Sequence, residues 1–221
     1  DIIAMNLAQL EAAKGVPLDV HTEYYAARGA TLVTVIAADH PGLFYRIAGG
    51  IHLAGGNIID ARIHTARNGM AVDNFLVQDP LGRPFSEDSQ LARIRKMIED
   101  ALAGRVKLVT QLAARPHSRP RADAFAVSPA AEFDNMASNR FTVIEVNARD
   151  RPALLSRLAR TLFEAKLMVH SAHIATYGER AIDTFYVTDL FGEKVDSVQR
   201  MKALEKKLVE AAEEQAAEVA A

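Results

Sequence analysis

The 221-residue sequence predicts an α+β fold built from two copies of one small domain. Three observations lead to this prediction: an internal repeat, an alternation of β-rich and helical segments within each copy, and an ordinary globular composition. Hydrophobic residues make up 49% of the chain and charged residues 24%, values that exclude disorder by composition. At roughly 100–200 residues per domain, the length accommodates two small domains.

The internal repeat is clearest where a β-rich stretch runs into an aspartate followed by a proline. Asp39 aligns with Asp150, and Pro41 aligns with Pro152. The aligned segments of the first and second copy are 31–44 with 142–155, 61–65 with 172–176, and 73–77 with 183–187. Because so many positions agree in one order, we interpret the chain as a tandem repeat.

The first copy has the local pattern of a β-α-β-β-α-β, or ferredoxin-like, domain. An apolar stripe at helical spacing follows Pro41 and ends at Gly55-Gly56. Asn68-Gly69 predicts a hairpin turn, and Ser86 is expected to cap a second helix that Gly104 ends. The expected strands are 32–38, 58–65, 70–77 and 106–112.

The second copy predicts the same elements up to its last helix. They are strands over 141–146, 169–176 and 181–187, a helix over 154–163, and a helix from Ser197. No fourth strand follows that helix. We therefore expect the segment before this copy, at 125–127 or 132–133, to supply the missing edge strand.

The repeat divides the chain into four parts. These are an N-terminal helix or linker over 1–22, a first domain over 23–114, a linker over 115–123 and a second domain over 124–221. The first part has helical apolar spacing and no repeat partner, so we expect it to be the end of an upstream domain. The chain also begins with Asp instead of Met, which suggests a piece of a longer parent.

Composition excludes several classes of function. The 26 Lys and Arg residues and 28 Asp and Glu residues leave a net charge of −2, which argues against a nucleic-acid partner. The absence of cysteine excludes disulfides, thiolate zinc sites and cysteine nucleophiles. No apolar run has the length of a membrane span and no signal peptide is visible, so we expect a cytoplasmic protein without a membrane partner.

The sequence offers no catalytic or metal-binding motif. Phosphate loops, nucleophile elbows and paired metal-binding histidines on a helix are all absent. His170 and His173 lie three residues apart on an expected strand, so their side chains point to opposite faces. Asp73 and Asp183 are repeat equivalents, which we interpret as polar positions on the sheet surface. We predict no catalytic residue, metal or cofactor in this chain.

The strand-to-helix corner Asp39-His40-Pro41-Gly42-Leu43 is the candidate ligand site. A helix N-terminus presents free N–H groups and a positive dipole end, which hold a carboxylate. Gly42 lets a ligand approach the backbone, Asp39 can neutralise an ammonium group, and Asn57 offers an amide. Together they suit a zwitterionic amino acid. On spacing alone, it stays open whether Asp39 only caps the helix and Gly42 only eases packing.

At these residues the sequence resembles the ACT domain family of small-molecule-binding, ferredoxin-like domains. The matching motifs are Asp-x-Pro-Gly-Leu at 39–43 and Gly-Gly-Asn-Ile-Ile-Asp-Ala-Arg at 55–62. The resemblance covers nearly all of residues 30–210 and implies two ferredoxin-like ACT domains in tandem. It also implies that amino acids bind at domain–domain interfaces and regulate an attached enzyme.

The pair is most similar to the C-terminal region of the bifunctional uridylyltransferase/uridylyl-removing enzyme family, which acts on the PII signal protein. The similarity rests on 39–48, 69–79, 141–155 and 181–189. It implies glutamine as effector, upstream catalytic domains in the same protein, PII as the substrate of the parent, and Mg²⁺ for the parent enzyme. This chain itself would be catalytically silent.

The resemblance places ligand contacts at both corners. The first copy contributes Asp39, His40, Pro41, Gly42, Leu43, Asn57 and Ile58, and the second copy contributes Asp150, Arg151, Pro152, Ala153 and Leu154. In the second copy, Ala153 stands where glycine is usual, and Met168 stands where the first copy has Asn57. We therefore expect the first corner to be the stronger site.

Two other interpretations remain open. The chain could be a free-standing tandem-ACT regulator that acts through protein contacts. It could also be a ligand-free oligomerisation module, for example one that forms a homodimer. Because ACT-like sheets often pair side by side, the two copies are also candidates for one continuous sheet within the chain.

Overall fold

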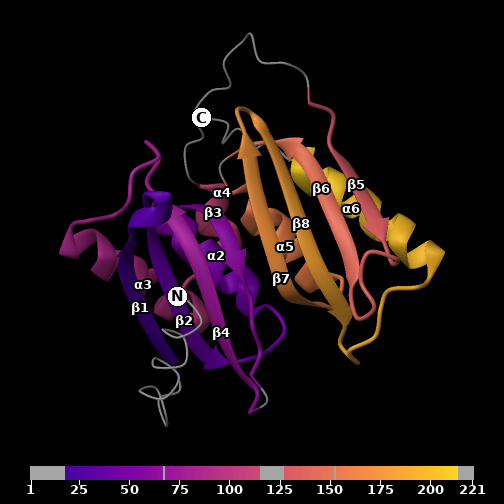
Figure 1. Cartoon of the computed structure of the whole chain (residues 1–221), viewed down its shortest axis with the longest axis horizontal. Coiled ribbons are helices and arrows are strands. Elements are labelled where there is room, and N and C mark those ends of the chain that lie inside the picture. Colours follow the sequence, from indigo (N-terminus) through magenta and orange to yellow (C-terminus); the bar gives the residue numbers. More distant parts are fainter. Residues whose placement is uncertain (1–17, 67, 115–126, 152, 214–221) are drawn as a thin grey trace.

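The computed structural model describes residues 18–66, 68–114, 127–151 and 153–213 (Figure 1). Strands and helices alternate along these ranges in two similar halves. The first half contains β1 (Leu18–Tyr25), the short 3₁₀ helix η1 (Ala26–Arg28), β2 (Ala30–Ala38), α2 (Leu43–Leu53), β3 (Asn57–Arg62), β4 (Met70–Gln78), α3 (Asp88–Leu102) and α4 (Leu108–Ala113). The second half contains β5 (Ala130–Asp134), β6 (Thr142–Arg149), α5 (Leu154–Glu164), β7 (Leu167–Tyr177), β8 (Arg180–Asp189) and α6 (Val198–Glu213).

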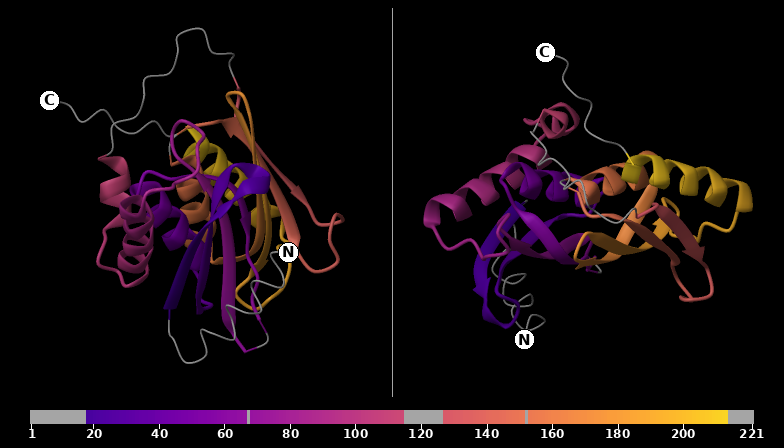
Figure 2. Two further views of the ribbon diagram at one scale, coloured as in Figure 1. Left: turned by 60° about the vertical axis from the view of Figure 1, so that its left-hand side comes forward. Right: turned by 90° about the horizontal axis from the view of Figure 1, so that it is seen from above.

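The eight strands form one antiparallel sheet in the order β1-β2-β4-β3-β7-β8-β6-β5. The described helices lie on one face of this sheet (Figure 2). Each half is therefore a two-layer unit with the strand arrangement of a ferredoxin-like domain. The predicted α+β fold class with two such units is confirmed.

The edge strand of the first unit comes from an unexpected part of the chain. The sequence pattern predicts a strand over 106–112, but this prediction is wrong, because α4 (Leu108–Ala113) forms there. Instead, β1 pairs with β2 along its whole length, from Leu18 opposite Ala37 to Tyr25 opposite Ala30. With that edge already taken, Leu108 packs among the helices, against Leu53 and Ala101.

The edge strand of the second unit lies where the repeat predicts it. Residues Ala130–Asp134 form β5, which pairs with β6, so the expectation for 132–133 is confirmed. Both edge strands thus precede the unit that they complete. Strand β1 also crosses the division placed at residue 22, because it begins at Leu18. The helix expected before residue 15 and the linker over 115–123 fall outside the described residues.

Two local predictions concern the turns of the first unit. Gly69 has a φ of 79°, and the Asn68 side chain accepts a hydrogen bond from the Met70 N–H at 3.1 Å, in keeping with the predicted turn. The predicted cap at Ser86 is wrong. Helix α3 starts one residue later than such a cap requires, with Glu87 as its N-cap residue and Asp88 in its first turn. The negative charge of Asp88 is stabilised there by the positive end of the helix dipole.

The two units meet along β3 and β7, which run antiparallel with Ala61 opposite Ala172. These two alanines are equivalent positions of the repeat, separated by the same 111 residues as Asp39 and Asp150. The units are therefore related by an approximate two-fold rotation that passes between Ala61 and Ala172. The two copies form one continuous sheet within the chain, which is the arrangement anticipated above.

One hydrophobic core extends through both units. Phe44 of α2 stacks on Phe75 of its own unit, with ring centroids 6.0 Å apart. The same ring meets Phe185 of the other unit edge-on at 6.3 Å. Contacts of this kind add to the area that the rings bury, so the joint between the units is part of the core. No helix in the described ranges is long and apolar enough to cross a membrane.

Candidate ligand-binding site

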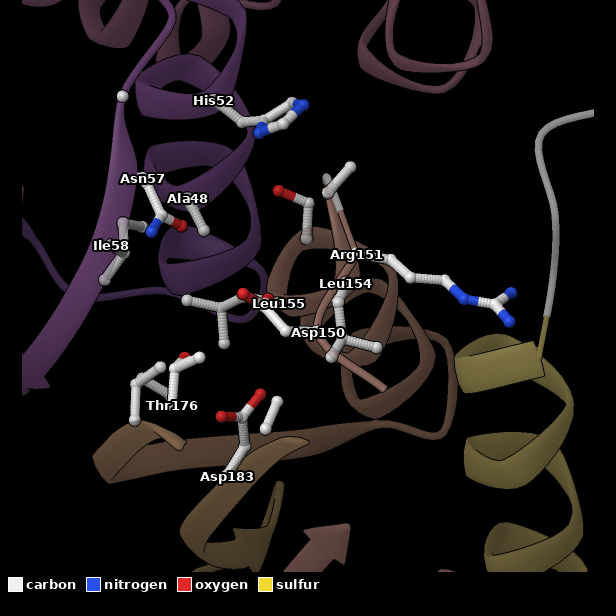
Figure 3. A pocket seen from close by; sticks show the side chains of 15 residues that line it. Ala48, His52, Asn57, Ile58, Asp150, Arg151, Leu154, Leu155, Thr176 and Asp183 are labelled. Atoms are coloured by element: carbon white, nitrogen blue, oxygen red, sulfur yellow. The ribbon is translucent and has the colours of Figure 1, made fainter. Parts of the chain in front are cut away.

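The joint between the units contains two hollows, one on each side of the approximate two-fold axis. The first hollow is lined by the corner of the second unit (Asp150, Arg151, Ala153 and Leu154) together with Asn57 and Ile58 of the first unit. Figure 3 shows Asn57 reaching in from β3 on the side opposite Asp150 and Leu154. The hollow therefore needs both units to be complete.

In the second hollow the roles of the two units are exchanged: the first unit supplies the strand-to-helix corner and the second unit supplies the residues that face it. Asp39, His40, Gly42 and Leu43 of the first corner face Met168 and Val169 of the second unit. The sequence interpretation assigned Asn57 to the same site as Asp39, and this assignment is wrong. The start of β3 lies against the other unit, because β3 and β7 are the strands that form the joint.

The remaining candidate residues have more ordinary environments. Leu43 and Leu154 are buried in the core, at 3% and 4% exposure, so their side chains pack under the corners. His40 is exposed, and its Nδ1 lies 2.8 Å from the Pro41 carbonyl oxygen. Pro152 falls outside the described residues.

Asp39 does not act as a helix cap in the first corner. Its carboxylate accepts a hydrogen bond of 2.6 Å from the Thr65 hydroxyl, and its backbone N–H donates to the Gly69 carbonyl. The N-cap residue of α2 is Gly42, and that of α5 is Ala153, so neither cap carries a side-chain acceptor. Each helix thus presents the positive end of its dipole to a hollow.

Gly42 fits the ring of Phe163 closely. A Cβ atom on Gly42 would lie 2.9 Å from the Cδ2 and Cε2 atoms of that ring, which also stacks on Tyr45 with centroids 6.1 Å apart. In the second hollow, the open backbone of the glycine is therefore covered by an aromatic side chain. The repeat equivalent of Phe163 is His52, which lines the first hollow.

A buried carboxyl group lies in each hollow. Asp183 is 2% exposed and lines the first hollow, and Asp73 is 0% exposed and lines the second. Burial raises the pKa of Asp183 to about 7, with a further contribution from the negative charge of Asp150. Burial and Asp39 likewise raise the pKa of Asp73 well above its usual value.

The prediction that Asp73 and Asp183 are surface positions is therefore wrong. The signal that places Asp73 inside was present in the sequence: it is two residues from Phe75 and four from Val77. On a strand these positions share one face, and both are fully buried. The alternation of side chains along the strand therefore predicts the burial of Asp73 better than its polarity does.

No group of three or more His, Asp or Glu side chains within the described ranges is arranged to hold a metal ion. His170 instead hydrogen-bonds Thr188 at 2.9 Å and stacks on Phe141 with centroids 4.9 Å apart. Burial lowers the pKa of His170, so its neutral form is favoured.

The fold defines the chain as a tandem pair of ferredoxin-like units with a hollow on each side of their joint. No family model matches the sequence. The chain is 77% identical, over 97% of its length, to the bifunctional uridylyltransferase/uridylyl-removing enzyme of Novosphingobium aromaticivorans, and 62% identical, over 96%, to that of Erythrobacter litoralis. The enzyme of Azospirillum brasilense is 46% identical over 88% of the chain.

The chain spans about a quarter of the length of these relatives: 24%, 23% and 21% in the order given. It is therefore homologous to a C-terminal part of the bifunctional uridylyltransferase/uridylyl-removing enzymes, as the sequence resemblance predicts.

The solved structures that match this chain are more distant in sequence. Aspartate kinase from Synechocystis has a TM-score of 0.44 and 18% identity, over 80% of this chain and 26% of its own. A putative glycine cleavage system transcriptional repressor has a TM-score of 0.27 and 14% identity, over 80% of this chain and 88% of its own.

Proposed function

We propose that this chain is the amino-acid-sensing regulatory region of a bifunctional uridylyltransferase/uridylyl-removing enzyme, with glutamine as the effector. The observation that carries the proposal is the meeting of Asn57 from one unit with the Asp150 corner of the other in a single hollow. A site that needs both units is sensitive to how they pack. Ligand binding there can therefore be coupled to their arrangement.

The first hollow suits the three polar groups of glutamine. The N-terminus of α5 favours the α-carboxylate, since its cap residue Ala153 offers no acceptor that would compete. The acidic side chains on this side favour the α-ammonium group. Asn57 has both a donor and an acceptor for the side-chain amide of the ligand. The first hollow is therefore our preferred site, whereas the sequence ranking favoured the corner at Asp39.

Binding requires the joint to open. The two hollows have volumes of only about 40 and 20 Å³, which suit water-sized groups. An amino acid would thus favour a packing of the two units with a wider joint, and it would shift the population toward that packing. In this proposal the catalytic domains, the Mg²⁺ that they use and the PII protein that they modify belong to the remainder of a cytoplasmic enzyme.

Calorimetric titration with glutamine tests the proposal, with glutamate and asparagine as ligand controls. We expect Asn57→Ala and Asp150→Ala to weaken binding by about tenfold or more, because each removes a polar contact. Their repeat equivalents Met168→Ala and Asp39→Ala are matched controls and should retain affinity within about threefold.

Two results would count against the proposal. If no amino acid produces heat at millimolar concentration, the sensing function is wrong. If Asp39→Ala abolishes binding while Asp150→Ala does not, glutamine occupies the second hollow.

The oligomerisation alternative makes a different prediction. Because β3 and β7 pair with each other, the side-by-side joint is already used within the chain. A homodimer would have to use another surface, and sedimentation with and without glutamine distinguishes the two cases.

A further inference from the structure

The Asp183 side chain is a buried carboxyl group in the lining of the first hollow. It lies on β8 opposite Val146 and is 2% exposed. Its Oδ1 atom has no hydrogen-bond partner within the described residues. Figure 3 shows the carboxyl group directed from the sheet into the hollow, below Asp150 and Leu154. A buried carboxylate without donors is costly, so this position favours the neutral acid.

The groups that surround Asp183 do not supply a positive charge at its carboxyl group. From the segment before α5, Asp150 adds a negative charge that disfavours ionisation. The neighbouring Arg151 turns away, and its guanidinium donates to the Glu213 carbonyl oxygen at 3.1 Å. Helix α2 contributes His52 at the far side of the hollow. The polar contributions of β3 and β7 are the neutral Asn57 and Thr176.

We infer that Asp183 binds the α-ammonium group of the ligand and releases a proton to solvent as it does so. This inference rests on the proposed function, since it names the counter-ion in the same hollow. The step balances simply: the protonated acid and the ammonium ion become a carboxylate–ammonium pair, and one proton goes to the buffer. The ligand thereby satisfies an oxygen that otherwise has no partner.

The first unit of the repeat provides a matched control for Asp183. Asp73 occupies the equivalent position in the other hollow, is 0% exposed, and has two oxygens without a hydrogen-bond partner in the described ranges. Its hollow is lined by Phe163 and Met168 where the first has His52 and Asn57. A change at Asp73 tests the general effect of removing a buried acid without touching the preferred site.

The test is calorimetric titration of the 221-residue chain near pH 6.5 in two buffers of different ionisation enthalpy. The ligands are glutamine and glutaramate, which is glutamine without its amino group. With a pKa of about 7 for Asp183, the wild type should release roughly three quarters of a proton per bound glutamine. Glutaramate should bind at least about tenfold more weakly and release none.

The variants separate the inference from the proposed function. Asp183→Asn should lose at least about tenfold in glutamine affinity and all proton release, while its glutaramate affinity stays unchanged. Asp73→Asn should keep the wild-type values. If Asp183→Asn binds glutamine with wild-type affinity and proton release, the inference is wrong and the sensing function stands. If the wild type binds no amino acid, the sensing function is itself wrong.

Thermal unfolding checks the buried acid independently of any ligand. Asp183 has a pKa of about 7 in the folded chain and an ordinary pKa of 3.8 in the unfolded chain. Between these two pH values, the folded chain keeps the Asp183 proton and the unfolded chain has lost it. The contribution of Asp183 to stability therefore falls as the pH rises through this interval. Asp183→Asn lacks this fall, so its midpoint temperature should exceed that of the wild type near pH 8 and approach it near pH 4. A lower midpoint near pH 8 would contradict the inference.

Discussion

At the scale of single residues, Gly42 and Ala153 show how two copies of one corner diverge. Both are N-cap residues with left-handed backbone, at φ 86° and 63°. For a residue with a Cβ atom, this conformation is unfavourable by about 1–2 kcal/mol. Gly42 is further constrained by the Phe163 ring, which occupies the space where a Cβ atom would lie. In the first hollow, His52 takes the position that Phe163 has in the second.

Exchanging the residues at the two corners should therefore have opposite effects. We expect Gly42→Ala to lower the free energy of unfolding by about 1–3 kcal/mol, from backbone strain and the clash with Phe163. Ala153→Gly should raise it by about 0.5–1 kcal/mol, since relief of strain exceeds the entropy gained by the unfolded chain. Urea unfolding measures both.

Phe163→Leu provides the control for the steric part of this effect, because Gly42→Ala should be less costly in that background. Equal losses of stability from Gly42→Ala and Ala153→Gly would show that backbone conformation does not govern these corners.

At the scale of elements, a threonine on the second strand of each unit, Thr31 on β2 and Thr142 on β6, fixes the segment that precedes the last long helix of that unit. The Thr31 hydroxyl donates to the Phe85 carbonyl at 3.1 Å and accepts from the Phe85 N–H at 2.8 Å. Thr142 accepts from the Val195 N–H at 2.8 Å in the second unit. The same contact thus recurs at equivalent positions and joins segments more than 50 residues apart.

Replacing either threonine by valine should destabilise the unit that contains it. Thr31→Val leaves the Phe85 N–H and carbonyl unpaired in a buried environment, which costs about 1–3 kcal/mol in the free energy of unfolding. Thr142→Val should behave alike. The half-buried Thr184 serves as the control, with an expected change of about 0.5 kcal/mol or less for Thr184→Val. Chemical denaturation gives these values, and a neutral Thr31→Val would contradict the role of this contact.

Also at the scale of elements, local pattern predicts most strands and helices but misses one edge strand. Residues 106–112 are β-rich, and nothing within a few residues of them indicates that β1 already occupies the edge beside β2. Whether a segment can join a sheet depends on a free edge, which is a property of the assembled sheet. The edge strand β5 was accessible to prediction because the first copy indicates that each unit needs an edge strand, and the segment before the second copy is β-rich.

At the scale of the whole molecule, the two units share one core and one sheet. Phe185 is fully buried and contacts Phe44 across the joint, while α2 and α5 lie side by side. Because this packing is continuous, neither unit can lose its structure without exposing apolar surface of the other. The joint that holds the candidate site is therefore also a determinant of stability.

Truncation of Phe185 should reveal this shared core. We expect Phe185→Ala to lower the free energy of unfolding by about 3–5 kcal/mol while the chain still unfolds in one transition. Scanning calorimetry tests this through the agreement of calorimetric and van't Hoff enthalpies. The control is Phe191→Ala at a side chain that is 90% exposed, where little change is expected. Two separate transitions would show that the units are independent.

The sequence by itself determined the repeat, the α+β class, most elements and the two corners, because these depend on patterns within a few residues. Only the tertiary structure decided that Asn57 faces Asp150 instead of Asp39, and that Asp183 is buried beside them. Asn57 and Asp150 are far apart in the sequence and meet only because β3 pairs with β7. Local propensity carries no information about this contact, because it depends on how the two folded units pack against each other.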